Sequence, residues 1–123
     1  MLEPSIVILY VNNLTKSREF YQDLLGIKSE ELSPSFNQFT LSNGMCLGLK
    51  IKDTIEPPVT EKNGGGELAF TLDDPAKIDE LFATLKIKGI AIAQPPTSMT
   101  FGYNFLAIDP DGNRLRFCSL RKS

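Results

Sequence analysis

The chain carries the same pattern of apolar and helix-capping residues twice, at an offset of 61 residues. The matching pairs are Val11 and Leu72, Asn13 and Asp74, Phe20 and Leu81, Tyr21 and Phe82, and Leu24 and Leu85. Both copies consist of an apolar run, a residue type that caps helices, and an apolar stripe at helical spacing. A repeat of this kind indicates one supersecondary unit present twice. We therefore predict an α+β fold of two tandem strand–helix–strand–strand–strand (βαβββ) modules.

The first module is predicted to occupy about residues 5–52. A β-branched, apolar run at 5–12 predicts a strand that is buried on both faces. Asn13 is expected to cap a helix that runs to about Leu25 and stops at Gly26. The remaining predicted elements of this module are strands at 36–42 and 45–51 and the hairpin turn between them, Asn43-Gly44.

The second module is predicted at about 67–119, after a linker at 53–66 that holds two prolines, three glycines and no periodicity. Its expected elements are a strand at 67–72, a helix capped by Asp74 with Pro75 first and Gly89 at its end, a short strand at 90–93, a Pro95-Pro96 loop and a hairpin within Phe101–Phe117. Each helix is expected to cover one face of its strands. The other faces would form one curved mixed sheet around a cleft, which makes residues 1–123 a single domain.

Composition excludes several classes of function. With 13 basic and 15 acidic residues among 123, the chain lacks the basic excess of a nucleic-acid-binding protein. The apolar stretch Ile6–Val11 is too short to span a bilayer, and no basic segment of a secretory signal precedes it. We therefore expect a cytoplasmic protein with neither a nucleic-acid partner nor a membrane partner.

The chain contains no histidine, which removes the commonest general base and the commonest metal ligand. Its two cysteines, Cys46 and Cys118, do not make a disulfide framework, and no CxxC spacing suggests a metal site. Two small buried apolar side chains are the favoured interpretation of the cysteines. Arg116 lies near Cys118 on the same strand face, so a reactive thiol is the alternative. We predict no cofactor and no metal.

Three stretches of the chain resemble a known superfamily. They are YVNNLTKSREFYQDLLGI (Tyr10–Ile27), ELAFTLDD (Glu67–Asp74) and FGYNFLAIDPDGNRLRF (Phe101–Phe117). The combination is similar to the vicinal oxygen chelate fold of glyoxalase I, bleomycin-resistance and extradiol-dioxygenase proteins. The resemblance covers nearly the whole chain and implies two βαβββ modules around a cleft.

The resemblance also implies where metal-using members would hold their ligands. Those positions correspond here to Ile6, Glu67 and Arg116. An arginine stays protonated and has no acceptor, so it cannot bind a metal ion. The metal chemistry of the superfamily is therefore not expected in this chain, and a binding protein is favoured over an enzyme.

Glu67 and Arg116 are expected to meet as an ion pair at the former metal position. Two interpretations of the pair stay open. It fills the cleft and holds two strands together, or its guanidinium recognises a carboxylate on an aromatic ligand.

Further candidate ligand-binding residues are aromatic or apolar. Phe101 and Tyr103, in or beside the predicted loop, suit a planar apolar molecule, whereas Phe105 is assigned to the core. Strand alternation places Tyr10 on the same face as Ile6. The remaining candidates are Phe39 and Leu49, whose strand face cannot be assigned from sequence alone.

The leading hypothesis is a metal-independent protein that sequesters a planar aromatic compound or antibiotic. The superfamily's metal-free members, which confer resistance to phenazine antibiotics or bleomycin, resemble the chain most and imply a homodimer with clefts shared between chains. The alternative is a metal-free lyase or isomerase with Glu67 as general base. A third possibility is a structural or regulatory protein with a vestigial cleft.

Overall fold

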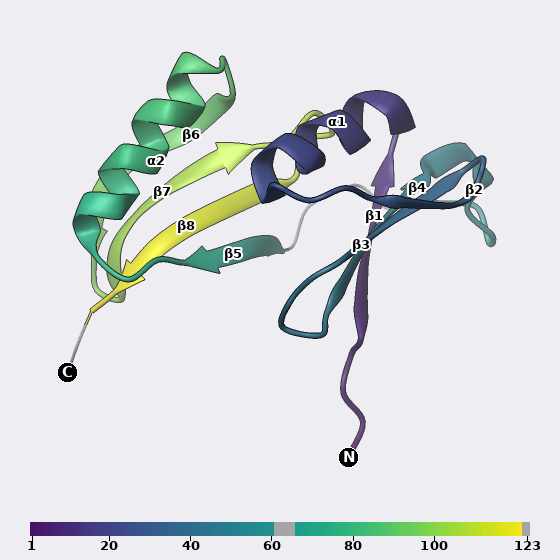
Figure 1. The fold of residues 1–123 in the computed structure, drawn as a ribbon, viewed down its shortest axis with the longest axis horizontal. Helices are drawn as coiled ribbons and strands as arrows, with labels where there is room; N and C mark the ends of the chain where they lie inside the picture. Colours follow the sequence, from purple (N-terminus) through teal and green to yellow (C-terminus); the bar gives the residue numbers. More distant parts are fainter. Residues whose placement is uncertain (61–65, 122–123) are drawn as a thin grey trace. The chain divides into compact units, whose positions relative to one another are not determined.

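The computed structural model describes residues 1–60 and 66–121. The chain divides into two compact units, one on each side of the segment 61–65. Each unit runs in the order strand, helix and three strands, which confirms the predicted α+β fold of two βαβββ modules (Figure 1). Neither of the two α-helices in the described ranges is long and apolar enough to cross a membrane.

Module 1 contains a four-stranded mixed sheet in the order β1-β4-β3-β2. Its elements are β1 (Ile6–Val11), α1 (Leu14–Leu25), β2 (Glu30–Ser33), β3 (Phe36–Thr40) and β4 (Cys46–Ile51), followed by a short 3-10 helix, η1 (Lys52–Thr54). Strand β1 pairs in parallel with β4, and the other pairs are antiparallel. Strand β2 is not among the predicted elements, because it is a short and largely exposed edge strand without an apolar alternation.

The predicted ends of α1 are confirmed. The side chain of Asn13 accepts a hydrogen bond from the Lys16 backbone N–H at 3.0 Å, which satisfies a donor that the first turn leaves free. At the other end Gly26 is left-handed, with φ of 71°, and its N–H donates to the Gln22 carbonyl. The helix packs on β3 and β4 through Tyr21, whose ring centroid lies 6.5 Å from that of Phe39.

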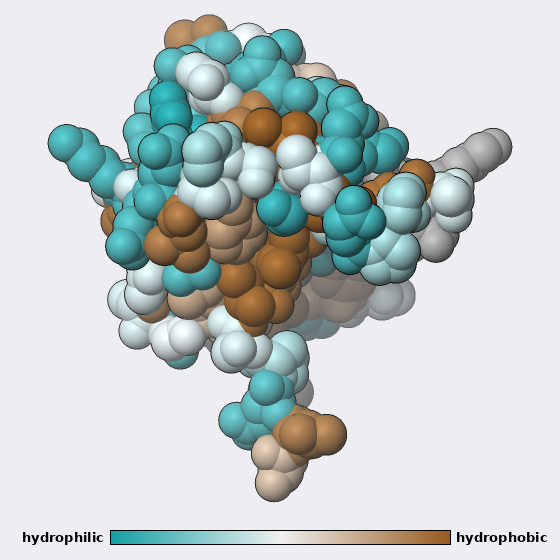
Figure 2. Space-filling view, turned by 90° about the vertical axis from the view of Figure 1, so that its right-hand side faces the viewer, coloured by the Kyte–Doolittle hydropathy of each residue, from teal (hydrophilic) through white to brown (hydrophobic). Residues whose placement is uncertain are grey.

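The prediction that β1 is buried on both faces is wrong. Val7, Ile8 and Tyr10 are 37%, 45% and 37% exposed. Strand β1 lies at the edge of its sheet with β4 as its one neighbour, and α1 packs mainly on β3 and β4. Figure 2 shows apolar surface gathered above the projecting N-terminal segment, on the side where β1 runs.

Module 2 repeats this topology, with strand order β5-β8-β7-β6 and β5 parallel to β8. Its elements are β5 (Glu67–Thr71), α2 (Pro75–Ile87), β6 (Ala91–Met99), β7 (Gly102–Ile108) and β8 (Arg114–Leu120). The α2 helix lies across one face of β6, β7 and β8 (Figure 1). A row of aromatic rings forms the core beneath it: Phe70, Phe117, Phe105 and Phe82, with successive centroids 4.8, 4.9 and 5.4 Å apart.

The predicted short strand at 90–93 and the Pro95-Pro96 loop are wrong, because β6 continues through both prolines to Met99. Proline has no N–H to donate and is tolerated on edge strands and at bulges. Strand β6 is such an edge, and its pairing with β7 shifts register on both sides of Gln94. Tyr103, predicted to lie in or beside that loop, is the second residue of β7.

The predicted final hairpin is confirmed. The Asp109 carboxylate accepts hydrogen bonds from the backbone N–H groups of Asp111 and Asn113 at 2.9 and 2.7 Å. Gly112 adopts a φ of 87°, which glycine tolerates without steric cost. The turn fixes the register in which Leu106 faces Arg116 across β7 and β8.

Candidate functional site

The candidate site lies on the face of the module 2 sheet opposite α2, called here the open face of module 2. In parallel register Ala69 of β5 faces Arg116 of β8, and Glu67 lies two residues before Ala69 on the same side. Asn104 of β7 faces Cys118, two residues beyond Arg116, and so points to that side as well. Pairing of β5, β8 and β7 thus gathers one carboxylate, one guanidinium and one amide.

The Glu67–Arg116 ion pair is present. Arg116 Nε donates to Glu67 Oε1 at 2.5 Å, and Arg116 Nη2 donates to Glu67 Oε2 at 3.2 Å. This two-bond geometry fixes both planes and is stronger than a single contact. The side chains of Arg116 and Glu67 are 17% and 32% exposed, so the pair is half-buried but open to solvent.

Asn104, which was not among the predicted site residues, holds Arg116 from the side opposite Glu67; Glu67 and Asn104 together are called here the clamp around Arg116. The Oδ1 atom of Asn104 accepts a hydrogen bond from Arg116 Nη1 at 2.6 Å. Its Nδ2 donates to the carbonyl oxygens of Thr97 and Gly102 at 3.3 and 3.5 Å, and its side chain is fully buried. The sequence does contain a signal for this role, because Asn104 is the polar residue within the apolar run GYNFLAI. A buried amide requires hydrogen-bond partners, so its position predicts a polar contact.

The clamp leaves part of the guanidinium available. Its three hydrogen bonds use three of the five N–H groups, and the other two have no partner within residues 1–60 and 66–121. The ring of Phe101, which is 41% exposed, has its centroid 5.8 Å from Arg116 Cζ. A charged donor pair and an exposed aromatic ring therefore lie side by side.

The electrostatics of the pair do not favour acid–base chemistry. The hydrogen bonds from Arg116 hold the pKa of the Glu67 carboxyl below its ordinary value, although partial burial acts in the opposite direction. Burial raises the pKa of the Cys118 thiol, against a smaller opposing effect of Arg116. Glu67 is thus a weak base at neutral pH, and Cys118 is predominantly a protonated thiol.

The structure places three other candidate residues away from the open face of module 2. Tyr103 points to the α2 side, where its hydroxyl donates to Asp79 Oδ1 at 2.7 Å. Phe39 and Leu49 belong to the module 1 core beneath α1, with no exposed surface. Their neighbours Gln38 and Gly48 face the other side of the sheet, so a shift of one residue along each strand would exchange the two faces.

Tyr10 lies on the open face of module 1, opposite α1. It faces Lys50, which in turn faces Phe36, so the three side chains form one row across β1, β4 and β3. The ammonium of Lys50 is 6.0 Å from the Phe36 ring centroid and donates to Ser35 Oγ at 3.1 Å. Tyr10 is 37% exposed.

The residues at the superfamily's metal positions do not fit a metal ion. Ile6 has no donor atom, Arg116 is a cation, and both oxygens of Glu67 are engaged by that cation. In the described part of the chain, no group of three or more Cys, Asp or Glu side chains is close enough to hold one. The residues at these positions therefore do not support metal-dependent chemistry.

Comparison with known proteins assigns the chain to a family. The model of the Glyoxalase/Bleomycin resistance protein/Dioxygenase superfamily matches residues 4–117. The chain is 30% identical over 122 residues to the phenazine antibiotic resistance protein EhpR of Enterobacter agglomerans, covering 97% of this chain and 93% of that protein. The chain belongs to the Glyoxalase/Bleomycin resistance protein/Dioxygenase superfamily, as its resemblance in sequence predicted.

Solved structures support the same fold. Protein ATC0852 from Agrobacterium tumefaciens is 47% identical, with a TM-score of 0.89 over 99% of this chain and 100% of that one. A glyoxalase/bleomycin resistance protein/dioxygenase from Nocardioides is 23% identical, with a TM-score of 0.83 over 100% and 86% of the two chains. The fold is therefore the vicinal oxygen chelate fold.

Proposed function

We propose that this protein binds and sequesters a planar aromatic compound that carries a carboxylate, without a metal ion and without transforming it. An antibiotic is the kind of compound envisaged, and resistance would follow from removing it from its target. Arg116 would receive the carboxylate, and Phe101 would stack on the aromatic part.

The observation that carries the proposal is the clamped guanidinium beside an exposed ring. Arg116 is held by Glu67 and Asn104, keeps two N–H donors without a partner in the described ranges, and lies 5.8 Å from the Phe101 ring centroid. A preordered guanidinium loses little conformational entropy on binding, which favours affinity. The similarity to a phenazine antibiotic resistance protein over 97% of the chain supports a ligand of this class.

A thermal-shift screen tests the proposal. A library of planar aromatic acids, including phenazine carboxylic acids, should raise the melting temperature in proportion to the logarithm of ligand excess over Kd. Matched amides should shift it less. Absence of a shift with every aromatic compound in such a library would favour the purely structural interpretation of the Glu67–Arg116 pair and a vestigial site.

The lyase or isomerase alternative is less well supported. It would require Glu67 as general base, and the hydrogen bonds from Arg116 that lower the pKa of Glu67 make that carboxylate a poor proton acceptor. An enzyme would change a bound aromatic compound. Recovery of the unmodified ligand after prolonged incubation, checked by mass spectrometry, separates the two functions.

We extend the proposal to a homodimer, because the chain resembles the dimeric, metal-free antibiotic-binding members of the superfamily. Sedimentation equilibrium should then give about twice the chain mass of 13.6 kDa. A mass equal to one chain at micromolar concentration would contradict the dimer, while leaving ligand binding by Arg116 to be judged by the thermal-shift screen.

A further inference from the structure

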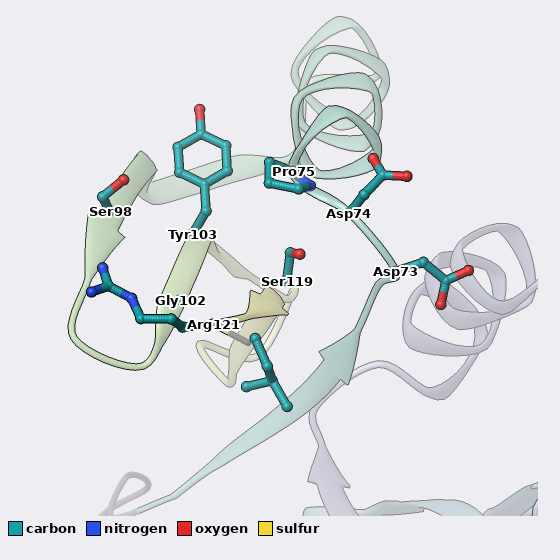
Figure 3. Close-up of a pocket in the computed structure, with 9 residues that line it drawn as sticks. Asp73, Asp74, Pro75, Ser98, Gly102, Tyr103, Ser119 and Arg121 are labelled. Atoms are coloured by element: carbon teal, nitrogen blue, oxygen red, sulfur yellow. The ribbon is translucent and has the colours of Figure 1, made fainter. Parts of the chain in front are cut away.

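A pocket lies on the α2 side of module 2, away from Arg116. Its volume is about 390 Å³, within the range of small-molecule sites. It is lined by the start of α2, by the ends of three strands and by the chain beyond β8, as Figure 3 shows. The side chains of Ser98, Tyr103 and Ser119 belong to the sheet face opposite Asn104 and Cys118. The pocket is therefore separate from the proposed aromatic site.

A row of hydroxyl groups contributes to the wall of this pocket. In register Ser98 of β6 faces Tyr103 of β7, which faces Ser119 of β8, so three adjacent strands each contribute one hydroxyl. Pro75, at the first turn of α2, lies on another side (Figure 3). Hydroxyl side chains from three neighbouring strands thus border the pocket, with the Tyr103 hydroxyl bonded to Asp79 of α2.

Ser119 is the sharpest indication that the pocket takes a ligand. The residue is 6% exposed, and its hydroxyl has no hydrogen-bond partner among residues 1–60 and 66–121. Figure 3 shows the Ser119 side chain directed toward the start of α2, on the side of Pro75. Because this hydroxyl is not fully enclosed, a molecule that enters the pocket can bond to it.

The remaining polar groups limit the chemistry of the ligand. Tyr103 donates its hydrogen to Asp79, so its oxygen can only accept within the pocket. Asp74 uses Oδ1 to accept from the Lys77 N–H, and Arg121 donates from Nη2 to the Met99 carbonyl at 3.3 Å.

Charges of both signs border the pocket. Asp73, Asp74 and Asp79 are carboxylates, and Arg121 and Lys77 are cations, with Lys77 3.2 Å from Asp73 and Asp79 bonded to the Tyr103 hydroxyl. A free anion would meet the carboxylates, and a free cation would meet Arg121. A neutral molecule with hydroxyls that both donate and accept fits the lining, and its C–H groups can contact Pro75 and the Tyr103 ring.

We propose that this pocket is a second binding site, which takes a small neutral polyhydroxylated molecule of monosaccharide size. Ser119 donates to and accepts from ligand hydroxyls, and Tyr103 and Ser98 extend the contacts along the row. The site is independent of the aromatic site on the open face of module 2.

Titration of ¹⁵N-labelled protein by NMR tests this site. The probes are methyl glucoside, ribose and myo-inositol, with inorganic phosphate and methylammonium as charged comparisons. Polyols should shift the amide signals of Ser98, Tyr103 and Ser119 in a saturable way. Ser119→Ala should weaken binding roughly tenfold, since it removes one hydroxyl that both donates and accepts. The exposed Ser42→Ala serves as the matched control and should leave the affinity unchanged.

Ser98→Ala, on the exposed edge strand β6, provides a second variant that should weaken polyol binding while the spectrum stays that of the folded protein. The proposal is overturned if no polyol shifts these signals, if Ser119→Ala and Ser98→Ala both bind as the parent does, or if phosphate or methylammonium binds more tightly than the polyols.

Discussion

Arg116 holds Glu67 through two hydrogen bonds between parallel strands, although 49 residues separate the two in the sequence. The pair offsets the cost of placing a half-buried guanidinium in the sheet. It also orients that guanidinium, because Nε and Nη2 point toward the carboxylate and Nη1 points toward Asn104. The guanidinium would be oriented in this way both in a purely structural ion pair and in a ligand-binding site. Substitutions are therefore needed to distinguish the two roles.

Removing the Asn104 amide should destabilise module 2. Asn104→Ala leaves Arg116 Nη1 without its acceptor and leaves the Thr97 and Gly102 carbonyls without their donor, in a fully buried position. Buried groups left without partners cost about 1–3 kcal/mol, which urea unfolding would detect. Thr100→Ala, at an exposed site, is the control for loss of a polar side chain. Equal unfolding midpoints for the two variants would contradict the clamp.

The Glu67–Arg116 pair should make stability depend on pH in the acid range. Because the pKa of Glu67 is lowered in the folded protein, its contribution is complete above the ordinary glutamate pKa and is lost as pH falls through the lowered value. Glu67→Gln should therefore be less stable than the parent at neutral pH, with the difference shrinking on acidification. Urea unfolding across pH measures this, with Glu30→Gln on the exposed strand β2 as control. A difference that stays constant with pH would count against the pair.

Gly102 should not tolerate a side chain. A Cβ at this position would overlap the backbone carbonyl oxygen of Ser119 on β8 and press on the sulfur of Cys118. Backbone atoms cannot move aside cheaply, so Gly102→Ala should lower stability by about 1–3 kcal/mol. Gly66→Ala is the control, because a Cβ there meets nothing within 4 Å. Thermal unfolding at a matched scan rate compares the two, and equal melting temperatures would show that β7 and β8 lie farther apart.

Tyr103 should titrate at unusually high pH. Its hydrogen bond to Asp79 raises the pKa of the phenol, since the neighbouring carboxylate disfavours a phenolate. Asp79→Asn should lower the pKa of Tyr103, seen as earlier tyrosinate absorbance in a spectrophotometric titration, whereas Asp53→Asn in η1 should not change it. An unchanged titration curve in Asp79→Asn would place Tyr103 away from α2.

Local signals in the sequence predicted most of the fold. Asn13 and Asp74 cap their helices as expected, because capping depends on the residue type and its immediate neighbours. The repeat then correctly gave two modules of equal topology. The prolines of β6 misled the prediction, since only the pairing of strands reveals that β6 is an edge where Pro95 and Pro96 are tolerated.

Properties that depend on register were harder to predict. Phe39 and Leu49 lie in the core, while Gln38 and Gly48 beside them face the other side, and a shift of one residue would exchange the two sets. Asn104 has an obvious role only once β7 is placed beside β8, where its amide meets Arg116. The pairing of Glu67 with Arg116 was predicted because the superfamily's ligand positions already relate those two residues.

Isothermal titration with a matched pair of ligands tests the central claim most directly. A phenazine carboxylic acid and its carboxamide have the same planar ring and differ mainly in the charge that Arg116 would receive. Arg116→Ala should weaken the acid by about 10- to 100-fold, the range of a charge-assisted hydrogen bond, and the amide by much less. The parent protein should prefer the acid. Equal weakening of both ligands, or tight binding of neither by the parent, would contradict recognition of a carboxylate by Arg116.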